Sequence, residues 1–230
     1  MKVLLFGASG TAGGAVLQAC LNARVVEEVR VVVRRSLGRT EAKLREFVHK
    51  DYVEYEAVTE AFRSVDACLF CLGISVTQAS KEEFRTISHD YAIAAAKKLK
   101  AESPGAAFHY ISGQGTRAES STFWSQVKGQ TENELMEQVG ATCWRPAFID
   151  AKPSGSLPKL YAVLGPPLRV LKPFRSLYVE GQDLGRAMLE ATQENLRQRV
   201  VENAEIRALA ERFAAQREGG LAAGTRRIGD

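Results

Sequence analysis

The sequence has no long hydrophobic run, and this shortage excludes a class of protein. Hydrophobic residues make up 45% of the 230 positions, yet no apolar run approaches the roughly 20 residues that span a bilayer. We therefore expect no membrane partner. The N-terminus begins directly with strand-like sequence, so we also expect no signal peptide.

Cysteine is scarce as well, with four residues in the chain. Cys68 and Cys71 have C-x-x-C spacing, but they fall in an apolar strand candidate over 67–72. Residues three apart on a strand point to opposite faces, and no His or Cys cluster lies nearby to complete a metal site. Buried, reduced thiols are the favoured interpretation, and they fit a cytoplasmic protein without a bound metal.

Strong charge of one sign is also missing, because the formal net charge is only +4. Such a charge mildly favours anionic ligands. It is too diffuse to indicate nucleic-acid binding, and no basic helix or nucleic-acid motif accompanies it. The expected partner is a small-molecule substrate.

A glycine-rich turn near the N-terminus is the most informative feature that is present. Val3 to Phe6 form an apolar run typical of a central parallel strand. Gly7-x-x-Gly10-x-x-Gly13 follows at once and leads into a helical segment. Gly7 permits a tight exit from the strand, Gly10 lets a diphosphate come close, and Gly13 lets the helix pack on the strand. The alternative is a glycine-rich turn that binds nothing. The predicted cofactor-binding residues here are Gly7, Ser9, Gly10, Thr11, Ala12 and Gly13.

The second predicted strand, over 29–33, ends in Arg34 and Arg35. A site that prefers NAD carries an acid about 20 residues beyond the glycines, where it binds the ribose hydroxyls. A guanidinium at that place instead binds a 2′-phosphate. We therefore expect NADP(H) in preference to NAD(H). The alternative is a solvated basic turn.

Strand and helix patterns alternate through residue 150. We expect a charged helix over 41–50, a third strand over 52–57 and a fourth over 66–72, then a helix over 81–100, a strand over 107–112, a helix over 122–139 and a strand over 142–148. This alternation predicts an α/β fold, a doubly wound sheet of about seven parallel strands. The strand ends predicted to lie beside the cofactor are Ala57 and Val58, and then Cys71, Leu72 and Gly73.

The remainder of the chain changes character. Five prolines fall within 152–173, which predicts a substrate-covering loop with a helix over 157–163. A strand over 177–179, a helix over 182–195, a strand at 200–201 and a helix over 204–217 should follow. We expect a single domain over 1–218, with a cofactor-binding core over 1–150 and a small lobe over 151–218. A mobile glycine-rich tail should occupy 219–230.

Three residues near the fifth strand carry a chemical pattern. Ser112 ends the strand, and Trp124 and Lys128 are four apart on one face of the next helix. This arrangement resembles the short-chain dehydrogenase/reductase family, in which a serine precedes a Tyr-x-x-x-Lys pair. The resemblance implies that Ser112 orients a substrate carbonyl. It also implies that Lys128 lowers the pKa of a phenol and holds the nicotinamide ribose. Further cofactor contacts are expected from Pro146, Ala147 and Phe148.

Several motifs are similar to one atypical branch of that family, the Tat-interacting-protein-like branch. The resemblance covers residues 1 to about 210 and implies an NADP(H)-binding Rossmann protein with a small C-terminal lobe. That branch includes regulatory proteins as well as oxidoreductases. A homodimer is compatible with the resemblance, and the sequence leaves the oligomeric state open. The motifs are the glycine-rich turn, Cys71-Leu-Gly73, His89-Asp-Tyr91, Ser112-Gly-Gln-Gly115, Gln126-Val-Lys-Gly129, Trp144-Arg-Pro146 and Val201-Glu-Asn203.

One departure divides the functional prediction. Trp124 stands where the family has its tyrosine, and an indole N–H does not act as a general acid as a phenol does. Ser88 also replaces an aspartate that relatives have before His89. Two functions stay open: an NADP(H)-dependent oxidoreductase on a small carbonyl or alcohol, and an NADP(H)-binding regulator without hydride chemistry. Other groups weighed as proton donors are Ser125, Tyr110, Tyr161, Tyr178, His89 and His109.

Overall fold

A seven-stranded parallel sheet forms the centre of the computed structural model, which describes residues 1–151 and 169–225. The strands are β1 (Lys2–Phe6), β2 (Glu28–Val33), β3 (Leu44–Val48), β4 (Ala67–Phe70), β5 (Ala107–Ile111), β6 (Thr142–Arg145) and β9 (Arg199–Glu202). Their order is β3-β2-β1-β4-β5-β6-β9, and every neighbouring pair is parallel. The strand order reverses between β1 and β4, as in a doubly wound Rossmann sheet. The predicted fold class is confirmed.

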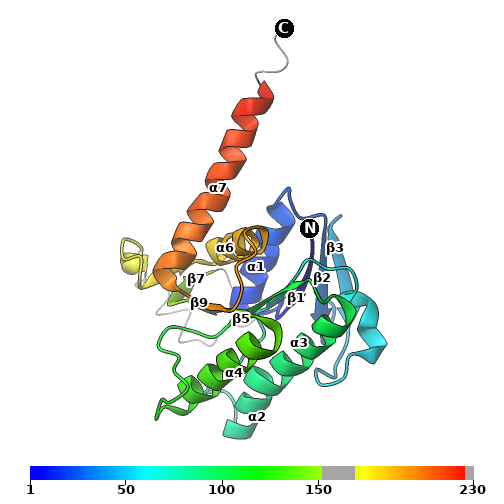
Figure 1. The fold of residues 1–230 in the computed structure, drawn as a ribbon, viewed down its shortest axis with the longest axis vertical. Coiled ribbons are helices and arrows are strands. Elements are labelled where there is room, and N and C mark those ends of the chain that lie inside the picture. The colour runs from blue at the N-terminus through cyan, green and yellow to red at the C-terminus, as the bar shows by residue number, and fades with distance from the viewer. Residues whose placement is uncertain (152–168, 226–230) are drawn as a thin grey trace.

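Helices cover both faces of this sheet (Figure 1). α1 (Thr11–Asn22) and α6 (Gly181–Gln193) lie on one face, and α2 (Lys81–Arg85), α3 (Tyr91–Glu102) and α4 (Phe123–Val139) lie on the other. A π-helical turn, η2 (Thr86–Asp90), joins α2 to α3. The last helix, α7 (Asn203–Thr225), packs on α6 and then extends away from the body.

The alternation of β1 explains why both faces need cover. Val3 and Leu5 point into the core beneath α1 and α6, while Leu4 and Phe6 point into the aromatic core on the α3 side. All four side chains are fully buried. The continuous apolar run is therefore a central strand, as the sequence predicts.

Small residues bring α6 close to α1. A Cβ placed on Gly181 would lie 2.6 Å from the Cβ of Ala15, and one on Gly185 would lie 2.6 Å from the Cβ of Ala19. Any larger side chain would force the two helices apart. This contact seats the C-terminal part of the chain against the helix that follows the glycine-rich turn. A small parallel sheet of β7 (Phe148–Asp150) and β8 (Tyr178–Glu180) precedes α6.

Two sequence predictions around the third strand are wrong. Residues 44–48 form the edge strand β3 rather than part of a helix, because β2 offers them a free edge and Val29 pairs with Leu44. An edge position tolerates the charged side chains that suggested a helix. The segment predicted as a strand over 52–57 is irregular and runs into the 3₁₀ helix η1 (Glu56–Phe62).

Smaller differences follow local chemistry. The expected helix over 81–100 contains the η2 turn, and the strand over 142–148 splits at Pro146 into β6 and β7. The helix expected over 157–163 lies outside the described residues. α7 continues to Thr225, so the tail predicted from Gly219 begins as helix, and 226–230 are not described.

Candidate functional site

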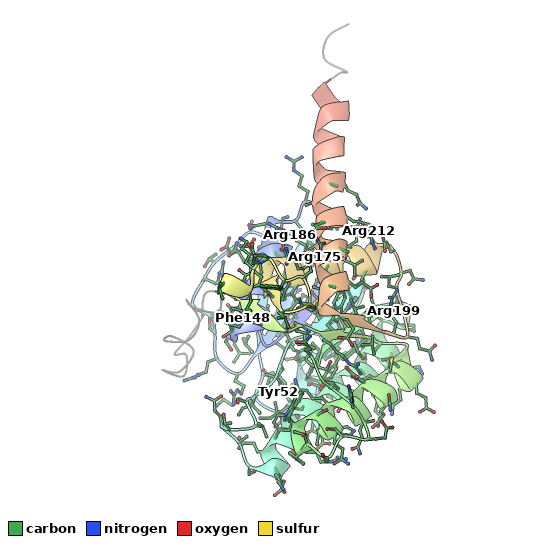
Figure 2. The ribbon with its side chains drawn as sticks, turned by 90° about the vertical axis from the view of Figure 1, so that its left-hand side faces the viewer. Tyr52, Phe148, Arg175, Arg186, Arg199 and Arg212 are labelled. Carbon is green, nitrogen blue, oxygen red and sulfur yellow. The ribbon has the colours of Figure 1, made fainter. Side chains whose placement is uncertain are left out.

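A cleft of about 1610 Å³ opens at the carboxyl ends of β1 and β2. Its walls come from the glycine-rich turn, α1, the loop after β2, the β7–β8 sheet and the start of α6. Such a crevice beside the strand-order reversal is where doubly wound folds bind ligands. Tyr52 and Arg186, both of which line the cleft, are labelled in Figure 2.

The start of the glycine-rich turn, residues 7–9, lines the cleft, and two of the turn's glycines are required by the fold itself. Gly7 has φ +79°, and a Cβ there would lie 2.6 Å from the carbonyl carbon of Cys71. A Cβ on Gly13 would collide with the carbonyl oxygen of Gly7. Gly10 is less constrained, because its Cβ would come only within 3.3 Å of that oxygen. The first and third glycines thus hold turn, strand and helix together.

Only some of the predicted cofactor residues line the cleft. Gly7, Ser9, Arg34, Arg35 and Leu72 do. The prediction for Ala57 and Val58 rested on a strand end that does not exist, and Val58 is buried in the core on the α3 side. The other predicted residues that do not line the cleft are Gly10, Thr11, Ala12, Gly13, Cys71, Gly73, Lys128, Pro146, Ala147 and Phe148.

The two arginines after β2 are exposed and available to a ligand. Among the residues that the structure describes, neither Arg34 nor Arg35 forms an ion pair or a side-chain hydrogen bond. The other cations of the lining are already paired with acids: Lys172 with Glu180 at 2.6 Å, Arg39 with Glu41 at 2.6 Å and Arg186 with Asp183 at 2.8 Å. An anionic ligand would therefore find its unpaired cations at the tip of β2.

Sequence reasoning missed several lining residues. Tyr52 was placed in a strand, yet it packs edge-on against Phe6 and lines the cleft next to Arg34. Burial raises the pKa of the Tyr52 phenol, and the charge of Arg34 opposes that rise. Arg186, on α6, also lines the cleft and pairs with Asp183 at 2.8 Å. No pattern in the sequence ties α6 to the cleft, since its position depends on the contact with α1.

The residues that resemble a catalytic triad lie outside the described lining of the cleft. The Ser112 hydroxyl is buried and donates to Glu132 Oε1 at 2.5 Å. Lys128 Nζ donates to the backbone carbonyl of Ser112 at 2.6 Å. Burial lowers the pKa of the Lys128 ammonium to about 8, and the Glu132 carboxylate opposes that shift. Ser112 is thus engaged on both its side chain and its backbone.

Glu132 lies beside Ser112, although no motif in the sequence singles it out. It is fully buried on α4 and receives Arg145 through Nε at 3.0 Å and Nη2 at 2.6 Å. A usable signal existed, because Trp124, Lys128 and Glu132 are spaced four apart on one helix face. Trp124 itself is half-buried, and a Cβ on Gly115 would lie 3.9 Å from its ring.

Most of the alternative proton donors have structural roles. The Ser125 hydroxyl donates to the carbonyl of Gly115 at 2.8 Å, and the Tyr110 hydroxyl donates to the carbonyl of Ser88 at 2.8 Å. His89 lies between Asp90 and Glu134. Of the two tyrosines expected in a small lobe, Tyr161 lies outside the described residues. Tyr178 lines the cleft and donates to Asp150 at 2.7 Å.

His109 is a buried structural group rather than a chemical one. Trp144 Nε1 donates to its Nδ1 at 3.1 Å, so the ring hydrogen sits on Nε2, which donates to Thr192 Oγ1 at 3.0 Å. Burial, assisted by the charge of Arg197, lowers the pKa of His109 to about 3. The imidazole is neutral near pH 7.

Two further observations bound the site. Within the two described ranges, no helix combines the length and apolar character that crossing a bilayer requires. Nor do three His, Cys, Asp or Glu side chains of the described residues gather closely enough to hold a metal ion. The four cysteines are free.

Comparisons with curated proteins find two relatives of interest. The Rattus norvegicus protein HTATIP2 is 30% identical over 141 residues, which is 59% of this chain and 57% of that protein. The Scheffersomyces stipitis protein FMP52-1, mitochondrial, is 28% identical over 139 residues, or 59% of this chain and 61% of that protein. The matches span less than two thirds of either relative. No protein-family model matches the chain.

Solved structures resemble nearly the whole chain. An oxidoreductase of the short-chain dehydrogenase/reductase family from Burkholderia thailandensis has a TM-score of 0.66 and 14% identity, covering 87% of this chain and 89% of its own. The UDP-glucose 4-epimerase of Thermus thermophilus, solved with NAD, has a TM-score of 0.64 and 18% identity, covering 93% and 84%. At these identities the likeness shows the fold.

Proposed function

Because the chain has the Rossmann fold of the atypical short-chain dehydrogenases/reductases, we propose that it binds NADP(H) and acts as an oxidoreductase on a small carbonyl or alcohol. The observation that carries the proposal is the cleft, which combines the start of the glycine-rich turn with two unpaired arginines at the tip of β2. We propose NADP(H) rather than NAD(H) on the strength of those arginines.

The residues of the turn fit a dinucleotide diphosphate. Gly7 and Gly13 bring the start of α1 against the end of β1, so that the helix begins at the carboxyl edge of the sheet. Amide hydrogens and the helix dipole together favour an anion at this point. A glycine at position 10 would also permit close approach of a phosphate, although its Cβ would already be 3.3 Å from the carbonyl oxygen of Gly7.

Arg34 and Arg35 supply the second half of the fit. A 2′-phosphate carries up to two charges, and a guanidinium binds it through charge-assisted hydrogen bonds. Arg34 continues directly from buried β2, which fixes its backbone at the mouth of the cleft. We assign Arg34 as the principal partner of the 2′-phosphate and Arg35 as its neighbour.

The chain's own residues have distinct tasks in this proposal. A bound nicotinamide coenzyme supplies or accepts the hydride. Lys128, half-buried and tied to the carbonyl of Ser112, contributes a cation for the ribose at the end of β5. Tyr178, on the lobe side of the cleft, is the phenol placed best among the described candidates to pass a proton.

Calorimetry with the two coenzymes tests the cofactor assignment. We expect Arg34→Ala to weaken NADPH binding by about 10- to 150-fold, which corresponds to roughly 1.5–3 kcal/mol for a charge-assisted hydrogen bond. NADH binding should stay nearly unchanged. Arg24→Ala, an exposed arginine that does not line the cleft, is the matched control. Equal losses for both coenzymes would refute the assignment, and the absence of any heat with folded protein would refute coenzyme binding itself.

A second candidate function is a coenzyme-binding regulator without hydride chemistry. Trp124 at the tyrosine position favours it, and so does Ser112, whose hydroxyl is committed to Glu132. NADPH oxidation across a panel of small carbonyls, with wild type and Trp124→Tyr side by side, separates the two. Turnover by wild type at a rate near that of the variant excludes the regulator. Binding without turnover in both weakens the oxidoreductase.

The remaining assignments are proposals of the same kind. We propose a small-molecule substrate, a cytoplasmic location and a homodimer that a sedimentation experiment would test. FMP52-1 is described as mitochondrial, so fractionation of the native protein decides the location.

A further inference from the structure

A stripe of three side chains runs along α4 toward the ends of β5 and β6. Trp124, Lys128 and Glu132 follow one another at intervals of four residues, which places them on one face of the helix. Glu132 is 1% exposed, and its carboxylate receives three donors, two from Arg145 and one from Ser112. A buried carboxylate so completely satisfied fixes the elements around it.

We propose that Glu132 and Arg145 are positioning residues that hold Lys128 as a cation at the end of β5. That Lys128 then contacts a coenzyme rests on the function proposed above. The positioning itself concerns only residues of this chain and can be measured without a ligand.

Ser112 links Glu132 to Lys128 through hydrogen bonds. Its hydroxyl donates to Glu132 at 2.5 Å, and its backbone carbonyl accepts Lys128 Nζ at 2.6 Å. Its amide donates to the carbonyl of Trp144 on β6 at 2.8 Å. Ser112 therefore links the Glu132 carboxylate, through its side chain, to the Lys128 ammonium, through its backbone. Lys128 Nζ also reaches the carbonyl of Ile111 at 3.4 Å.

The second link is electrostatic. Burial disfavours the charged form of Lys128, and the Glu132 carboxylate, one helical turn away, favours it. Arg145 binds that carboxylate through two of its nitrogens, and its third nitrogen donates to Glu202 of β9 at 3.1 Å. From β5, Tyr110 packs nearby as a buried neutral phenol, its pKa raised by burial. The Glu132 carboxylate is therefore the charge that favours the Lys128 ammonium, and Arg145 holds that carboxylate in place.

This arrangement predicts a fall in the titration midpoint of Lys128 when Glu132 loses its charge, and a loss of structure would not produce such a fall. Glu132→Gln removes the attraction and keeps the shape, so the titration midpoint of Lys128 should fall. General loosening would let water in and move that midpoint up toward the ordinary lysine value near 10.4. A fall therefore separates electrostatic positioning from a merely structural role.

The experiment is an NMR titration of Lys128 itself. Protein labelled with ¹³C-lysine is titrated, and the Lys128 Cε resonance is assigned by its absence in Lys128→Arg. We expect Glu132→Gln to lower the midpoint by about one pH unit, a tenfold shift in the proton equilibrium. Glu134→Gln, on the same helix but bonded to His89, is the control and should leave the midpoint unchanged.

A second variant covers the case in which Glu132→Gln does not fold. Glu132→Asp keeps the negative charge but moves it away from Lys128 by the length of one methylene. The titration midpoint of Lys128 should therefore fall by less than it does in Glu132→Gln. An unchanged or raised midpoint in either folded variant would overturn the proposal.

Coenzyme binding distinguishes this proposal from the function on which it builds. NADPH affinity, measured by calorimetry from pH 6.5 to 9.5, should decline as Lys128 loses its proton, and the decline should begin at lower pH in Glu132→Gln. No NADPH binding at any pH would refute the proposed function, while the NMR midpoints would still decide the positioning. Binding with midpoints that do not fall would leave the function standing and refute the positioning.

Discussion

Removing Arg145 while leaving Glu132 in place should destabilise the protein strongly. The Glu132 side chain is 1% exposed and that of Arg145 is 21% exposed. In Arg145→Met the carboxylate keeps only the Ser112 hydroxyl as a donor among the bonds described for its oxygens. A buried charge that loses its partner costs about 3–5 kcal/mol of unfolding free energy.

The double variant Arg145→Met/Glu132→Leu removes both charges and keeps the volume nearly constant. Replacement of a whole buried ion pair by apolar residues of similar size is often close to neutral. We therefore expect the double variant to recover at least about 2 kcal/mol of what the single variant loses, a coupling in the range for directly contacting groups. Glu202 becomes an exposed carboxylate without its arginine, which costs little.

Urea unfolding at pH 7.5, followed by circular dichroism, measures both effects. The control is Arg63→Met, because Arg63 pairs with Glu102 at 3.1 Å while its side chain is 63% exposed. An exposed pair of that kind contributes about 0–1 kcal/mol. If Arg145→Met costs no more than Arg63→Met, or if the double variant costs the sum of its two singles, the reasoning about a buried and satisfied carboxylate is wrong.

Two other predictions follow from single residues. Gly13→Ala should displace the carbonyl of Gly7, which should cost about 1–3 kcal/mol of stability, as overpacking does, and weaken NADPH binding at least tenfold. Gly105→Ala is the control and should do neither, because its Cβ would meet nothing within 4 Å. Full NADPH affinity in Gly13→Ala, measured by calorimetry, would contradict this prediction. His109 is held neutral, with a folded pKa of about 3 against 6.5 for the ordinary group. The folded state therefore binds fewer protons, and the stability that His109 contributes above pH 6.5 is lost as pH falls toward 3, at up to about 1.4 kcal/mol per pH unit. Urea midpoints at pH 7.5 and 4.5 should converge in His109→Gln, and an unchanged difference would sink the assignment.

The central strands of the parallel sheet could be predicted because each is a short apolar run that is visible in the sequence itself. Val3 to Phe6 and Ala67 to Phe70 are continuous apolar runs, and both prove to be central strands buried on each face. Turn and cap residues between them are also local, and Gly140 ends α4 in the left-handed conformation at φ 63°. The doubly wound Rossmann fold, which the resemblance to the short-chain dehydrogenases/reductases implies, is confirmed.

The third strand could not be predicted in this way. Leu44 to Val48 carries charged residues and becomes a strand because β2 leaves an edge to pair with, which is a property of the sheet and not of the segment. Tyr52 and Tyr55 are spaced for a turn around Phe6, so their aromatic character misleads toward a strand. The expectation that Ala57 and Val58 lie beside the cofactor depended on this strand, which does not form.

The two halves of the candidate site differ in how far a sequence can specify them. The coenzyme half depends on backbone: Gly7 and Gly13 are required by the packing of β1 on α1, and Arg34 is placed by the end of β2. The proton-transfer half depends on single side chains, and one substitution at Trp124 removes the acidic group without disturbing the helix that carries it. Coenzyme binding can therefore persist after the chemistry has changed, which is why the binding test must be made first and the turnover test interpreted against it.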